Sequence, residues 1–157
     1  MISRPMKTAA LFLSIATVQV AAYAALPLSA AQAQEAPVAA LTLAFKGITQ
    51  PTGAIRGQLF ADQAGYEGKG KAVSTFAVPV TGDSASLIVP GLAPGRYAVK
   101  AFHDVDGDGK MATNPFGIPT EPFAFSNDAR GAFGPADWAD AAFEVGPGET
   151  AHAITID

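Results

Sequence analysis

Tyr97-Ala98-Val99-Lys100-Ala101-Phe102-His103 is the stretch that decides the fold. Pro94 and Gly95 lead into it, and a turn rich in aspartate and glycine, residues 104–109, ends it. Its side chains alternate with the two-residue period of a β-strand. We predict that one face points into the core, with Tyr97, Val99, Ala101 and His103, and that Lys100, Phe102 and Asp104 lie on the other face.

Six more short apolar runs have the same character, and Gly, Pro and Asp residues separate them. They cover residues 41–45, 54–60, 72–80, 84–89, 141–145 and 151–156. Thr81-Gly82-Asp83 resembles a hairpin turn between two of the runs, and 137–141 has room for one helical turn. No helical period longer than two turns occurs. The pattern predicts an all-β fold, an antiparallel β-sandwich of about seven strands.

The N-terminus has the pattern of a secretory signal peptide. Arg4 and Lys7 precede an apolar stretch, and Ala31-Gln32-Ala33 follows as a cleavage site. The alternative is a retained membrane anchor. With residues 1–33 removed, residues 34–157 make one domain that we expect to be periplasmic or secreted, with no membrane span. The sequence has 0 cysteines, which excludes disulfides, zinc-thiolate sites and a lipid anchor on cysteine.

The charge is negative and uneven. The full chain has a net charge of −4, and the two basic and no acidic residues of 1–33 leave 8 − 14 = −6 for the rest. Residues 104–144 hold eight acidic side chains against Lys110 and Arg130. A nucleic-acid partner is therefore excluded, because phosphate binding needs clustered basic residues.

The long segment 104–137 has many turn residues and almost no strand pattern. Its aromatic residues and Trp138 predict an ordered loop that folds back on the sandwich, because disordered segments contain few aromatics. The aromatic residues are Phe116, Phe123, Phe125 and Phe133. The alternative is a platform for a carbohydrate or a peptide, with Trp138, Phe125 and Asn127 as ligand-binding candidates.

The acidic turn resembles the first half of a calcium loop. Asp104, Asp106 and Asp108 alternate ahead of Gly109, and the backbone carbonyl of Lys110 follows at position seven. Pro115 stands at position twelve, where a calcium loop has a bidentate acid. We therefore expect Glu121 or Asp128 to complete a Ca²⁺ site, and the alternative is a tight turn that suits Asp and Gly.

Catalytic patterns are weak in this sequence. His103 lies beside Asp104, but its predicted core face makes it a hydrogen-bonded supporting residue rather than an acid or base. The sequence contains no Gly-x-Ser-x-Gly motif, and Ser126 beside Asn127 suits a turn. We expect no enzyme, with a small hydrolase as the third hypothesis after the two binding functions.

Several motifs from Pro94 onward have a recognisable order. They are Pro94-Gly95-Arg96-Tyr97-Ala98-Val99, His103-Asp104, Thr113-Asn114, Phe116-Gly117-Ile118-Pro119, Phe125-Ser126-Asn127 and Gly134-Pro135. Together they resemble the exported bacterial family called domain of unknown function 2141, which implies a β-sandwich and no known activity. That family more often has Asn where this chain has Asp106 and Asp108. The strand start also resembles transthyretin-like and carboxypeptidase-regulatory sandwiches.

These observations predict an exported, non-enzymatic binding or interaction module. Its expected partner is an envelope protein, a peptide or a glycan. Calcium is the expected cofactor, held at the acidic turn or used to order the loop.

Overall fold

The computed structural model describes residues 38–157, and the predicted signal peptide, residues 1–33, lies outside them. The elements are β1 (Ala39–Lys46), β2 (Ala54–Phe60), α1 (Gln63–Tyr66), β3 (Ser74–Pro79), β4 (Ser84–Leu92), β5 (Gly95–Asp104), β6 (Phe123–Phe125), a 3-10 turn (Ser126–Asp128), α2 (Trp138–Ala141), β7 (Phe143–Val145) and β8 (Gly148–Thr155). All seven predicted strands and the short helix at 138 are present. Within residues 38–157, no helix is long and apolar enough to span a membrane.

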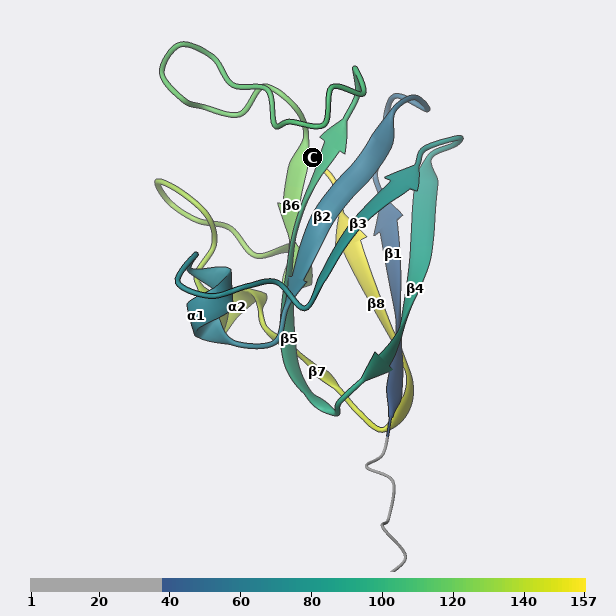
Figure 1. Ribbon diagram of the computed structural model, residues 1–157. Coiled ribbons are helices and arrows are strands. Elements are labelled where there is room, and N and C mark those ends of the chain that lie inside the picture. The colour runs from purple at the N-terminus through teal and green to yellow at the C-terminus, as the bar shows by residue number, and fades with distance from the viewer. Residues whose placement is uncertain (1–37) are drawn as a thin grey trace, which may run out of the picture. The chain divides into compact units, whose positions relative to one another are not determined.

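The strands form two sheets that pack face to face (Figure 1). One sheet has the order β4-β1-β8, and the other has the order β3-β2-β5-β6, with β7 paired to the start of β5. The side chains of Leu41, Leu43 and Phe45 on β1 are fully buried, as are those of Ile55 and Val99 on the opposing sheet. Burial of each such side chain contributes about 1.5–3 kcal/mol. The predicted β-sandwich is confirmed.

The pairing differs from the prediction at two places. β1 and β8 run parallel, so the smaller sheet is mixed rather than purely antiparallel. The predicted hairpin between β3 and β4 does not form, because β3 pairs with β2 and β4 pairs with β1. Phe76 of β3 and Leu87 of β4 both pack against the core cluster, one from each sheet. The connection at 80–83 therefore crosses between the layers.

A second, smaller cluster lies on the outer face of the larger sheet. Tyr66 is buried there, its hydroxyl donates to the carbonyl of Ala136 at 2.9 Å, and the Trp138 ring lies 5.8 Å from its ring. α1 and α2 thus cover the half of the outer face near the start of β5. The half near the end of β5 stays open, and this is where the candidate site lies.

Candidate functional site

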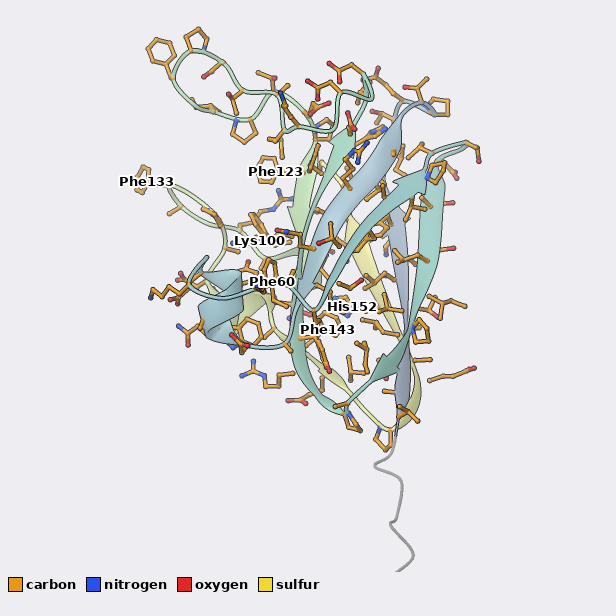
Figure 2. All side chains as sticks on the ribbon, viewed as in Figure 1. Phe60, Lys100, Phe123, Phe133, Phe143 and His152 are labelled. Carbon is orange, nitrogen blue, oxygen red and sulfur yellow. The ribbon has the colours of Figure 1, made fainter. Side chains whose placement is uncertain are left out.

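The open half of the outer face is a groove of about 930 Å³. Strands β2, β3, β5 and β6 form its floor, and the segments 109–119 and 131–135 form its walls. Figure 2 shows Phe123 and Lys100 on the side of the sheet from which the loop with Phe133 extends. Volumes of this size are typical of pockets for small-molecule ligands.

Strand register explains the composition of the floor. Residues that face each other across adjacent strands point to the same side of the sheet. One row crosses the sheet as Thr75, Gln58, Lys100 and Phe125. The next row is Ala77, Arg56, Phe102 and Phe123. The floor therefore changes from polar on β3 and β2 to aromatic on β6.

Three large apolar side chains in the walls are exposed to solvent. Phe116 is 88% exposed, Ile118 is 59% exposed and Phe133 is 107% exposed. The prediction that all aromatic residues of the long segment pack against the sandwich is thus wrong for Phe116 and Phe133. It is right for Phe125, which is buried, and for Phe123, which is partly buried against the second cluster.

Local hydrogen bonds fix the tip that carries Phe116. The Asn114 side-chain oxygen accepts from the backbone N–H of Phe116 at 2.9 Å and of Ile118 at 3.1 Å. A bridge between Thr113 and Pro119 closes the tip. The exposed ring therefore lies on an ordered turn that presents it at the groove wall.

The turn that carries Phe133 depends on a glycine. A Cβ atom on Gly131 would lie 2.0 Å from the Gly134 carbonyl oxygen, so no larger residue fits. The chain doubles back tightly at this point and places Phe133 at its tip.

The charge of the groove is opposite to that of the chain. Its lining contains two ionisable residues, Arg56 and Lys100, and no acidic side chain. Lys100 is partly buried, and its Nζ donates to the carbonyl of Tyr66 at 2.5 Å. Burial lowers the pKa of Lys100, and the charge of Glu67 opposes this shift. The Arg56 charge is paired with Asp104 of the acidic turn, so the positive charge of the groove floor comes from Lys100, between apolar walls.

The acidic turn lies at the end of β5 and borders the groove at Gly109. Ligand atoms of Asp104, Asp106 and Asp108 lie within 4.8 Å of one another. Asp104 is fully buried, whereas Asp106 and Asp108 are exposed. Gly107 and Gly109 have φ angles of 77° and 81°, the left-handed region in which glycine is unstrained.

Asp104 acts as an acceptor at the centre of this turn. Its Oδ1 accepts from the N–H of Gly107 at 2.9 Å, and its Oδ2 accepts from Gly109 at 3.1 Å. The Arg56 Nε donates to the same Oδ2 at 2.5 Å. Burial alone would raise the pKa of Asp104. The hydrogen bond and charge of Arg56, together with the hydrogen bonds from the two backbone N–H groups, outweigh burial, so the pKa of Asp104 lies below its ordinary value.

These contacts limit how the turn could hold calcium. Ca²⁺ takes six to eight oxygen ligands, and a guanidinium group already pairs with the buried carboxylate. Asp106 and Asp108 each accept one backbone N–H within the turn, at 3.1 Å and 2.8 Å. A cation at this position would have to be held mainly by the exposed Asp106 and Asp108 and by the Lys110 carbonyl.

The two acids that were expected to complete the cage have other partners. Glu121 accepts from the N–H groups of Val105 in the turn and of Ala112 after it, both at 2.9 Å, and so ties the turn to the segment that carries Phe116. Asp128 accepts from the N–H and the hydroxyl of Thr155 on β8. The structure therefore brings together Asp104, Asp106 and Asp108, and does not add Glu121 or Asp128 to that cluster.

Three other residues singled out by sequence contact neighbouring segments: His103 is buried, Trp138 is partly buried and Asn127 is exposed. His103 is 1% exposed on the core face, and its Nε2 lies 2.7 Å from the carbonyl of Thr52. Trp138 packs beside Tyr66 and against the second cluster. The Asn127 side chain donates to the carbonyls of Asp140 and Ala142.

Arg56 and Lys100 are the site residues that sequence reasoning missed. Each is a basic residue within a strand pattern, on the face opposite the core. That position is the sequence feature from which a site on the outer face could have been predicted. Their importance depends on the register between β2 and β5, which places Arg56 diagonal to Asp104 and Lys100 opposite Gln58.

The fold and the groove define an all-β sandwich with an open, amphipathic sheet face. The chain belongs to the family described as uncharacterized protein conserved in bacteria, DUF2141, whose match covers residues 43–153. No curated protein and no solved structure matches the chain.

Proposed function

We propose that this protein is a non-enzymatic binding module of the bacterial envelope whose ligand lies in the groove on the outer face of the larger sheet. The observation that carries the proposal is the pair of exposed rings, Phe116 and Phe133, on two ordered turns beside the same groove. Exposed apolar side chains around a concavity are typical of ligand sites. Location in the periplasm or outside the cell is part of this proposal, and it rests on the pattern of residues 1–33.

A neutral apolar dye, N-phenyl-1-naphthylamine, tests the groove. We expect saturable fluorescence enhancement with one site per chain, and weaker binding by several-fold in the Phe116→Ala/Phe133→Ala variant. The matched control is Ile88→Ala, which removes a 66% exposed apolar side chain from β4 in the other sheet. Equal dye binding by the double variant and the wild type would refute the groove as the site.

Calcium binding at the acidic turn is the second function that we propose. The convergence of three aspartates within 4.8 Å favours it. Because Arg56 competes for Asp104, we expect weak affinity, of the order of 10⁻⁴–10⁻³ M as in extracellular modules. Calorimetry with CaCl₂ and melting with and without EGTA test it. Absence of both heat and a melting shift at millimolar calcium would exclude this function.

A further inference from the structure

Three polar residues form a row across the floor of the groove. Thr75 on β3 faces Gln58 on β2, and Gln58 faces Lys100 on β5. The same three residues also line a neighbouring hollow of about 510 Å³ beside α1. The row therefore lies where the two concavities meet, and its side chains can contact a ligand from either one.

Lys100 has an unusual environment for a lysine. Its ammonium group lies 4.1 Å from the ring centroid of Tyr66 and donates to a backbone carbonyl. Among residues 38–157, no carboxylate lies within ion-pair distance of it. Glu67 lines the neighbouring hollow and its charge acts on Lys100 from farther away, but its carboxylate pairs with Lys69. A partly buried cation without a carboxylate partner is stabilised by a bound anion, since burial of an unpaired charge is costly. The direction of its pKa shift agrees with this environment.

The groove becomes apolar on the β6 side of the row. Phe102 and Phe123 form the adjacent floor, and Phe116 and Phe133 stand on the walls. No acidic side chain lines this space, although the chain as a whole is acidic. One end of the groove thus suits an anion and the other suits an apolar group.

Building on the groove function proposed above, we infer that the ligand is a single-chain amphiphile with a carboxylate head, a fatty acid in chemical class. The head lies on the Thr75–Gln58–Lys100 row, where an ammonium, an amide and a hydroxyl can donate to it. The chain lies between the two loops, against Phe102 and Phe123. Charge-assisted hydrogen bonds fix the head, and burial of methylene groups supplies most of the affinity.

The composition of the groove disfavours the two ligand classes predicted from sequence. A peptide brings main-chain N–H and C=O groups that need partners, and those of the floor strands β2 and β5 already pair with neighbouring strands. A glycan brings many hydroxyl groups, whereas the lining beyond the polar row is mostly aromatic, aliphatic or glycine. An amphiphile needs polar contacts at one end only.

The test compares ligands of equal chain length by calorimetry, each below its micelle concentration. We expect dodecanoate to bind about tenfold or more tightly than dodecanol, because hydrogen bonds to charged groups contribute about 1.5–3 kcal/mol. Dodecyltrimethylammonium should bind more weakly than dodecanol, and butyrate, with its short chain, should give no measurable heat. Equal affinity for the three twelve-carbon ligands would overturn the head-group assignment while leaving the groove function intact. Absence of binding by all of them and by the neutral dye would overturn both.

The variant Lys100→Met locates the head. It removes the charge but keeps an unbranched side chain, and no ion pair in the described residues depends on Lys100, so we expect the fold to survive. The variant should bind dodecanoate only as tightly as it binds dodecanol. Its affinity for dodecanol should differ little from that of the wild type. The matched control is Lys46→Met, which removes the same charge from an exposed position on β1. The assignment would be refuted if Lys100→Met still bound dodecanoate tenfold more tightly than dodecanol. It would also be refuted if Lys46→Met lost this preference to the same extent as Lys100→Met.

Discussion

Replacement of Asp104 by asparagine separates the two interpretations of the acidic turn. The carboxylate accepts two backbone N–H groups and the Arg56 guanidinium while fully buried. An asparagine keeps one acceptor oxygen but turns an NH₂ donor toward the remaining donors. Loss of one partner of a buried, hydrogen-bonded charge pair costs about 3 kcal/mol. In a domain of this size that lowers the melting temperature by roughly 10 °C.

The matched control is Asp106→Asn, because Asp106 is exposed and accepts only the N–H of Asp108. If Asp104 serves as an internal acceptor paired with Arg56, the control should change stability by about 0.5 kcal/mol or less. If a calcium ion supplies the stability, the two variants should both be destabilised and EGTA should abolish the difference from wild type. Urea denaturation followed by circular dichroism measures both variants.

The effect of Asp104→Asn should also depend on pH. The folded-state pKa of Asp104 lies below the ordinary value of 3.8, so the unfolded chain binds the proton first. The stability that the carboxylate contributes is present above pH 3.8 and is lost as the pH falls through the folded-state pKa. The difference in melting temperature between wild type and Asp104→Asn should therefore have its full size at pH 7 and become smaller below pH 3.8. A variant that melts within 2 °C of wild type at pH 7, or a gap that does not change in acid, would refute this account.

Three further substitutions test other contacts. Burial lowers the pKa of His152 below 6.5, with the charge of Asp128 opposing, and its Nε2 accepts from the N–H of Asn127 at 3.2 Å. The stability that neutral His152 contributes is present above pH 6.5 and should be lost as the pH falls through the folded-state pKa. In His152→Gln, the melting temperature should no longer show this decrease with falling pH. Ser126→Ala should cost about 2 kcal/mol in urea denaturation, because its buried hydroxyl satisfies the Val99 N–H and the Ala141 carbonyl. Glu121→Gln should speed hydrogen exchange at Val105 and Ala112, whereas the exposed Glu149→Gln should leave both rates unchanged.

The strands could be predicted because their signal is local. The alternation from Tyr97 to His103 gives both faces of β5, and the structure buries Tyr97, Val99 and Ala101 in the main core as expected. Gly and Pro residues mark the strand ends. These features depend on residues close in sequence, so a single chain contains enough information to place them.

The parts that could not be predicted depend on contacts between distant segments. β6 has three residues, which is too few to show the two-residue period of a strand. It forms because residues 100–102 of β5 offer a strand edge with which it pairs. β7 pairs with β5 in the larger sheet, whereas β8 pairs parallel with β1 in the smaller one, so this pairing joins the two ends of the described chain after a crossing between the layers at residues 146–147. The partner of Asp104 required the register of β2 against β5, which no local pattern specifies.

The acidic turn and the groove are parts of one structure. Asp104 fixes the backbone at Gly107 and Gly109, and Glu121 ties Val105 to Ala112. These bonds hold both ends of the segment that carries Phe116 to the groove wall. Arg56 lines the groove and neutralises the buried aspartate from the groove side. The carboxylates therefore shape the loop as acceptors for its backbone N–H groups, and a strand face that would otherwise be flat becomes a walled groove.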